Sequence, residues 1–147
     1  MTAALLLSCA LAAPDHHLQE ENTGAKADGG IVARVTAAVG EKGADKPFLL
    51  IVTMTAKEGK AKELIAAYRG AAAASKAEPG CTAYNLHRDQ ENPRELLLYE
   101  RWKSVDALNM HLDQPYTRAF VAKIGELTDK SAVAIMKGIP ANAPAAK

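Results

Sequence analysis

The chain has 147 residues, enough for one domain with its own hydrophobic core. Apolar residues make up 48% of the chain and charged residues 24%, which is typical of a globular protein. The 18 Lys and Arg are balanced by 17 Asp and Glu, so the chain lacks the basic excess expected of a nucleic-acid-binding protein. Two cysteines allow neither a disulfide framework nor a Cys-rich zinc site, and no apolar run is long enough to span a bilayer.

Residues 1–13 have the pattern of an export segment. Residues 3–13 read AALLLSCALAA, an apolar run of signal-peptide length, and Ala10-Leu11-Ala12 fits a small-x-small cleavage site. Leu6-Leu7-Ser8-Cys9 also resembles a lipoprotein box, in which Cys9 carries the lipid. We therefore expect an exported protein, periplasmic or lipid-anchored through Cys9. Because no Lys or Arg precedes the apolar run, a cytoplasmic location is the alternative.

Residues 14–46 have the composition of a flexible linker, rich in Gly, Ala and charge. Within them, the apolar stretch 31–39 (IVARVTAAV) is compatible with a short edge strand. His16 and His17 beside Asp15 lack the further ligand that a metal site needs, and we expect no metal site.

A compact domain is predicted at 47–139, followed by a Pro/Ala tail at 140–147. Strands are indicated by apolar, β-branched or alternating segments, and helices by apolar residues at helical spacing. Turn and capping residues set the boundaries: Glu78-Pro79-Gly80 ends the first helix, Ser104 caps the second, and Pro115 begins the third. In order, the expected elements are strand 48–56, helix 60–77, strands 81–89 and 94–102, helix 105–112, a helix from Pro115, and strand 131–139.

This order is β-α-β-β-α-β, with the second helical element broken in two. It predicts an α+β, ferredoxin-like fold with a four-stranded antiparallel sheet and helices on one face. The other face would be left bare, and an apolar bare face needs a cover. We therefore expect a homodimer in which two sheets pack face to face, a dimeric α+β barrel.

Several short motifs carry a family resemblance. In chain order they are Pro79-Gly80-Cys81, Tyr84, Asn92-Pro93, Tyr99-Glu100-Arg101-Trp102, Ala107-Leu108, His111-Leu112 and Phe120. Together they resemble the antibiotic biosynthesis monooxygenase domain, in particular its quinol monooxygenase branch, over residues 47–139. The resemblance implies a dimeric α+β barrel and an oxygenase without metal, flavin or haem, acting with O₂ on a small aromatic substrate.

Two other branches of that family match less well. The haem-degrading branch carries an Asn on its first strand, and FLLIVTMTA at 48–56 has none. An isomerase branch that handles a phosphorylated sugar has a Pro-His pair where this chain has Pro115-Tyr116. Both departures favour the oxygenase branch.

An oxygenase without a cofactor uses its substrate as the reductant, so the protein must remove a proton, hold the oxyanion and keep the site dry. His111 is the candidate base. It lies three and four residues after Leu108 and Ala107, on the same face of its helix, and apolar neighbours hold an imidazole pKa near or below neutrality. A core histidine bonded to backbone is the alternative.

The candidate substrate-binding residues are aromatic, apart from one carboxylate. Alternation places Glu100 on the same strand face as Trp102, and an ion pair between Glu100 and Arg88 on the neighbouring strand is the structural alternative. Trp102 suits stacking on an aromatic ligand, although a lone strand Trp is often core. The full predicted set is Tyr68, Tyr84, Glu100, Trp102, Tyr116 and Phe120.

Three functions follow from these residues. The first is a cofactor-independent monooxygenase for a quinol-like or polycyclic phenol. The second is a non-catalytic, stress-related or aromatic-ligand-binding dimer, and the third is an isomerase that works by proton transfer at His111. Consumption of O₂ separates the first from the other two.

Overall fold

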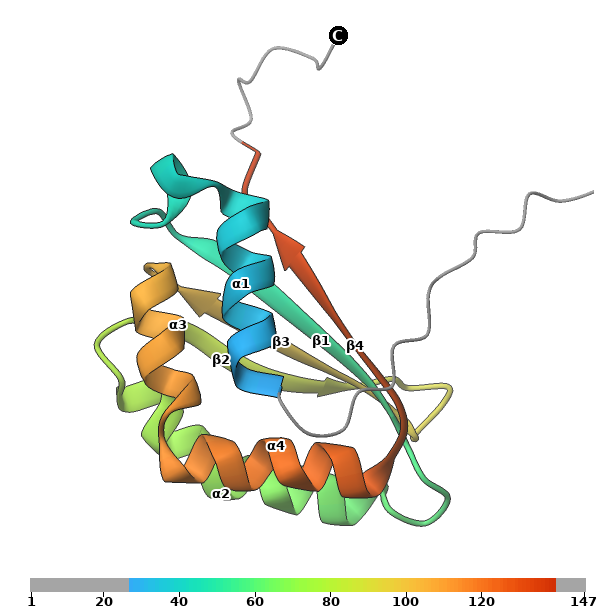
Figure 1. The fold of residues 1–147 in the computed structure, drawn as a ribbon. Helices are drawn as coiled ribbons and strands as arrows, with labels where there is room; N and C mark the ends of the chain where they lie inside the picture. The colour runs from blue at the N-terminus through green and yellow to red at the C-terminus, as the bar shows by residue number, and fades with distance from the viewer. Residues whose placement is uncertain (1–26, 140–147) are drawn as a thin grey trace, which may run out of the picture.

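The computed structural model describes residues 27–139 (Figure 1). The expected export segment with Cys9, residues 14–26 of the expected linker, and the Pro/Ala tail lie outside the described residues. The elements are α1 (Ala27–Val39), the short 3-10 helix η1 (Glu41–Gly43), β1 (Phe48–Ala56), α2 (Ala61–Ala77), β2 (Cys81–Arg88), β3 (Glu95–Trp102), α3 (Val105–Leu112), α4 (Pro115–Leu127) and β4 (Thr128–Met136).

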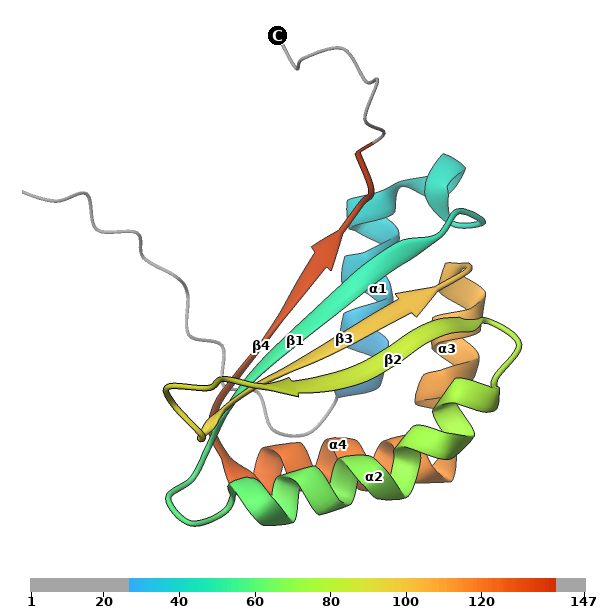
Figure 2. The same ribbon diagram turned by 180° about the vertical axis from the view of Figure 1, so that it is seen from behind.

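The four strands form one antiparallel sheet in the order β2-β3-β1-β4. This arrangement confirms the predicted α+β, ferredoxin-like fold. The helices within residues 27–139 lie on one face of the sheet, and the view from behind shows the strands with no helix in front of them (Figures 1 and 2). The predicted site residues of β2, β3, α3 and α4 therefore meet in the layer between the sheet and its helices.

The two faces of the sheet have different burial. Along β1, the side chains of Phe48, Leu50, Val52, Met54 and Ala56 are buried beneath the helices, and the alternate ones are half-buried or exposed. The pairing register brings the alternate residues of three strands together on the uncovered face. They are Leu49, Ile51, Leu97, Tyr99, Ala134 and Met136.

The last strand begins earlier than the sequence indicates. It was expected at 131–139 and spans Thr128–Met136, directly after α4. Thr128 is the C-cap of α4 and has an extended backbone, and its Oγ1 donates to the Ile124 carbonyl at 2.7 Å. The neighbouring Asp129 pairs with Arg94, which fastens the polar start of this edge strand to the hairpin. Tertiary contacts thus extend the strand over Asp129 and Lys130, which have little strand propensity.

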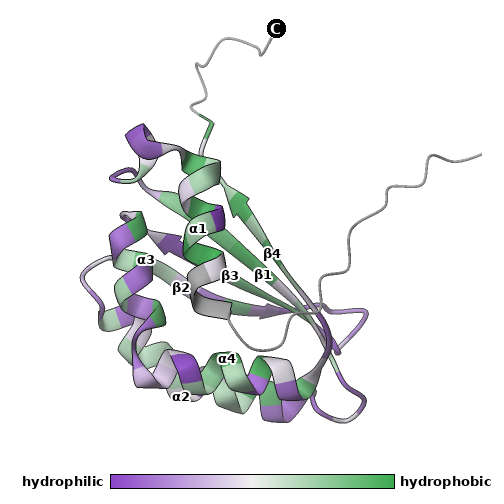
Figure 3. Ribbon diagram, viewed as in Figure 1, coloured by the Kyte–Doolittle hydropathy of each residue, from purple (hydrophilic) through white to green (hydrophobic). Residues whose placement is uncertain are grey.

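Residues 27–39 form a helix, so the expectation of a flexible linker with an edge strand is wrong for this stretch. Ile31, Val32, Val35 and Val39 recur at helical spacing, and Val35 is completely buried against the core. Arg34 Nη2 donates to the Val133 carbonyl of β4 at 3.0 Å. The apolar stripe is visible in green where α1 crosses the sheet (Figure 3). Packing of this stripe explains why the segment is ordered.

None of the helices within residues 27–139 is long and apolar enough to cross a membrane.

Candidate functional site

The turn between α2 and β2 is packed directly on α3. The Cys81 amide donates to the Glu78 carbonyl at 3.0 Å, which closes the turn, and the Lys103 amide donates to the Gly80 carbonyl at 2.9 Å. A Cβ on Gly80 would lie 2.2 Å from the Cβ of Ala107 on α3. Only glycine permits this approach. The turn thereby carries Glu78 to the helix that holds His111.

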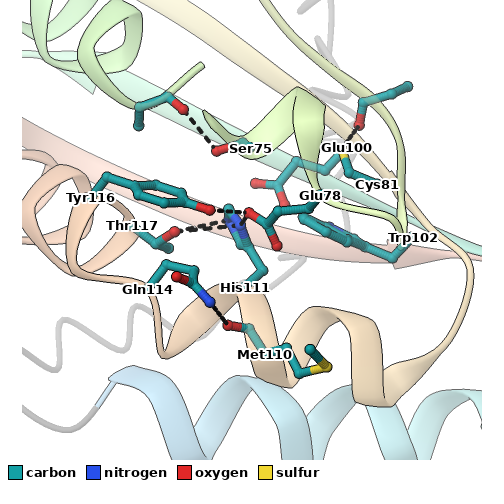
Figure 4. A network of polar contacts seen from close by, with 12 residues as sticks. Ser75, Glu78, Cys81, Glu100, Trp102, Met110, His111, Gln114, Tyr116 and Thr117 are labelled. Carbon is teal, nitrogen blue, oxygen red and sulfur yellow. Dashed lines mark hydrogen bonds and ion pairs between the residues drawn. The ribbon is translucent and has the colours of Figure 1, made fainter. Parts of the chain in front are cut away.

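Helix α3 presents His111 to that turn. The helix is capped by Ser104, whose Oγ accepts from the Ala107 amide at 3.2 Å. The last turn of α3 places the His111 side chain inside the protein, 2% exposed. His111 Nδ1 lies 2.6 Å from Glu78 Oε1, and Thr117 Oγ1 lies 3.3 Å from the same nitrogen. Figure 4 shows these side chains converging from α2, α3 and α4.

The Glu78 oxygen has a second donor. The Tyr116 hydroxyl, from the first turn of α4, donates to Glu78 Oε1 at 2.8 Å. A carboxylate at the C-terminal end of a helix opposes the helix dipole, and Glu78 caps α2 at that end. The contact with His111 Nδ1 and the hydrogen bond from the Tyr116 hydroxyl offset this cost.

The opposite wall of the site belongs to β3. The His111 ring lies 4.4 Å from the Trp102 ring, measured between centroids, and Trp102 Nε1 donates to Glu100 Oε2 at 2.9 Å. The proposed ion pair with Arg88 is wrong, because Arg88 pairs with Leu96 at the far end of the hairpin and Tyr84 lies opposite Glu100. Glu100 is buried, with an indole N–H as its bonded neighbour.

Burial dominates the pKa values here. It lowers the pKa of His111, and the hydrogen bond and charge of Glu78 act against that shift, so the imidazole is neutral at neutral pH. Burial raises the pKa of Glu100 to about 7, with a smaller contribution from the Glu78 charge and an opposing one from Trp102. Burial and the bond to Glu78 raise the pKa of Tyr116 to about 12. Glu100 therefore changes charge near neutral pH, whereas Tyr116 stays a phenol.

The other predicted aromatic residues continue the cluster. The Tyr68 hydroxyl donates to the Tyr84 carbonyl at 3.1 Å, and the two rings stack at 5.7 Å. Phe120 lies 6.2 Å from Tyr68, and Tyr84 lies 5.6 Å from His111. Burial, followed by the Glu100 charge, raises the pKa of Tyr84 far above its ordinary value. The structure thus brings all seven predicted site residues into one connected group.

Sequence reasoning missed Glu78 and Thr117. The sequence pattern identifies Glu78 only as part of the Glu78-Pro79-Gly80 segment that ends a helix, and no pattern indicates a functional role for Thr117. A carboxylate that ends a helix is electrostatically misplaced, which is the one feature that could have marked Glu78 as a paired residue.

The cluster is filled with side chains. A surface hollow of about 420 Å³ lies apart from the cluster and is lined by Thr53, His87, Arg88, Asp89, Glu95, Leu96 and Leu97. A second hollow, of about 270 Å³, borders the cluster at Tyr84 and is lined by Lys76, Cys81, Thr82, Ala83, Tyr84 and Asn85. Among the ring and polar partners of His111, Trp102, Tyr84 and Thr117 are buried, whereas the Glu78 side chain is 15% exposed and Tyr116 is half-buried. Solvent therefore approaches His111 past these two residues. Within 27–139 no three potential ligands among His, Cys, Asp and Glu gather as a metal site would require.

Comparison with solved structures supports the fold. Rv0793 from Mycobacterium tuberculosis superimposes with a TM-score of 0.61 at 26% identity, covering 67% of this chain and 100% of that one. PA3566 from Pseudomonas aeruginosa superimposes with a TM-score of 0.61 at 28% identity, covering 66% of this chain and 98% of that one.

Two curated relatives match in sequence. The uncharacterized protein sll1783 of Synechocystis sp. is 34% identical over 91 residues, which are 62% of each chain. Rv0793, named as a candidate monooxygenase, is 38% identical over 53 residues, 36% of this chain and 52% of that protein. The match thus spans 62% and 52% of the length of these relatives.

The sequence model of one family, antibiotic biosynthesis monooxygenase, matches residues 47–123, just over half of the chain. The predicted resemblance is confirmed, and α1 precedes the matched region. The protein belongs to the antibiotic biosynthesis monooxygenase family.

Proposed function

We propose that this protein is a cofactor-independent monooxygenase that oxidises a quinol-like or polycyclic phenol with O₂. The observation that carries the proposal is the 2.6 Å contact between Glu78 and His111, set among aromatic side chains in a member of this family. Such a pair can accept a proton at the edge of a buried aromatic cluster, which is the step a substrate-reduced oxygenase needs.

The chemistry starts with loss of the phenolic proton to the Glu78–His111 pair. The phenolate passes one electron to O₂, the two radicals combine through a new C–O bond, and the O–O bond then breaks with loss of water. For a quinol the sum is quinol plus O₂ giving hydroxyquinone plus water, so the substrate supplies all the electrons. A positioned base contributes about 10²–10⁴ in rate to such a step.

The remaining members of the cluster shape the site around the ring. Tyr116 and Tyr68 are half-buried and can offer aromatic surface to a polycyclic phenol, whereas the buried rings of Trp102, Tyr84 and Phe120 form the packed wall behind them. Glu100, whose pKa is raised to about 7, can donate or accept a hydrogen bond at neutral pH. No metal or other cofactor enters this proposal.

Oxygen consumption tests the function. The full chain, purified and stripped of metal, is mixed with a panel of quinols and anthrones, and O₂ uptake is recorded after subtraction of autoxidation. We expect uptake above the blank for at least one substrate, one O₂ per substrate, and one atom of ¹⁸O in the product from ¹⁸O₂. Uptake equal to the blank across the panel contradicts an oxygenase, and turnover of a substrate without O₂ uptake identifies an isomerase.

We also propose that the uncovered sheet face pairs with a second copy. Leu49, Ile51, Leu97, Tyr99, Ala134 and Met136 give it an apolar centre, and Met136 is 49% exposed in the single chain. Light scattering on the eluting protein should give twice the chain mass. Ile51→Lys places a charge at the centre of the interface and should yield monomers, whereas Ala66→Lys, on the exposed side of α2, should not. A monomeric wild type rules the interface out.

A further inference from the structure

We propose that the Glu78 carboxylate is the group that takes the proton from the phenolic substrate. In this assignment His111 is a positioning residue behind it, and the Tyr116 hydroxyl holds the place that the substrate's hydroxyl takes. The oxidation step rests on the proposed function, but the binding of a phenol at Glu78 does not, so the two can fail separately.

Glu78 and His111 differ in how far they are buried. His111 is 2% exposed, covered by Trp102 on one side and by Tyr84 at its edge. The Glu78 side chain is 15% exposed and reaches the protein surface. A ligand arriving from solvent therefore meets the carboxylate first, and the imidazole only through it.

Tyr116 already shows how a phenol binds there. Its hydroxyl donates to Glu78 Oε1 at 2.8 Å, its ring lies 6.4 Å from the His111 ring, and the side chain is half-buried. A substrate phenol that replaces it exchanges one O–H···O bond for another and leaves the carboxylate satisfied. The exchange is possible without breaking the buried part of the cluster, because Tyr116 is half-buried and lies at its solvent-facing side.

The imidazole fixes the carboxylate for this step. A 2.6 Å contact between Nδ1 and Oε1 requires one proton between them, and because Oε1 already accepts from the Tyr116 hydroxyl, we infer that the proton is on Nδ1. The step is then phenol plus Glu78 carboxylate giving phenolate plus Glu78 carboxylic acid, while the imidazole keeps its proton. The Glu78 proton later leaves with the reduced oxygen as water, which restores the carboxylate. Carboxylates act in this way on other weak acids.

A phenol that O₂ does not oxidise separates binding from turnover. We would titrate the full chain with 4-nitrophenol at constant pH, following the phenolate absorption band and the fluorescence of Trp102, the single Trp in the chain. Wild type should bind the phenol and quench Trp102. Glu78→Gln removes a charged acceptor and should weaken binding about 10- to 100-fold, whereas Tyr116→Phe removes a competing donor and should tighten it roughly 2- to 10-fold. Glu58→Gln, at an exposed loop position, is the matched control.

His111 variants identify the base. Asn can donate from Nδ2 where His111 donates from Nδ1. His111→Asn should therefore keep phenol binding within about 3-fold of wild type and, if the oxygenase is active, most of kcat. His111→Leu has no donor and should lose both phenol binding and kcat. Thermal unfolding checks that each variant is folded. Three results would each overturn the assignment. The first is a wild type that fails to bind the phenol, and the second is a Glu78→Gln variant that binds it as well as wild type does. The third is loss of turnover in His111→Asn while Glu78→Gln keeps it. Phenol binding as predicted with no O₂ uptake leaves Glu78 as the phenol site and removes the oxygenase.

Discussion

Gly80→Ala is expected to abolish most of the proposed oxygenase activity. The new Cβ would lie 2.2 Å from the Cβ of Ala107 and 3.3 Å from its Cα, so the turn and α3 must move apart. That movement separates Glu78 from His111, and a displacement of about 1 Å in a catalytic group costs about 100-fold in rate. Overpacking of this kind also costs about 1–3 kcal/mol of stability.

A rescue and a control make the result specific. Ala107→Gly removes the clashing methyl group, so the Gly80→Ala/Ala107→Gly double variant should recover part of the activity and stability. Gly125→Ala, on α4, meets no atom within 4 Å and should stabilise the helix by up to about 1 kcal/mol. The measurements are kcat/KM for O₂ uptake and the free energy of unfolding in urea. Wild-type values for Gly80→Ala would show that the turn can yield without disturbing the site.

Glu100→Gln is expected to stabilise the fold at high pH and to have no such effect at low pH. The pKa of Glu100 rises from its ordinary value of 4.5 to about 7 in the folded protein, because the side chain is buried among apolar neighbours. Between these two values the folded chain binds a proton that the unfolded chain has released, so stability falls as pH rises. The penalty is absent below about pH 4.5 and complete above about pH 7, where it reaches roughly 3 kcal/mol.

The amide keeps the shape and the acceptor for Trp102 Nε1 but carries no charge. The stability difference between Glu100→Gln and wild type should therefore grow by about 3 kcal/mol between pH 4 and pH 8. Urea unfolding across that range measures it, and Glu58→Gln, an exposed change, should give a constant difference. A difference that stays flat for Glu100→Gln would mean that Glu100 is ionised in the fold, with a cation or water nearby.

The sequence alone predicted the order of the elements in the family domain and nearly all of their boundaries. Alternation places Leu96, Leu98, Glu100 and Trp102 on one face of β3, and all four are buried. Ser104 caps α3, and Pro115 is the first residue of α4, as expected. These features depend on neighbours within a few residues, so local physics suffices to determine them.

Only the tertiary structure decided what the candidate site is. Glu78 and His111 are separated by 33 positions, and their contact depends on the approach of Gly80 to α3, which no local pattern encodes. The neighbour of Glu100 is Trp102 and not Arg88, because the pairing register places Arg88 at the other end of the hairpin. Helix α1 likewise is ordered because Val35 is buried against the rest of the chain. Periodicity shows which residues face inward; which of them touch depends on packing between segments distant in sequence, and that packing forms the site.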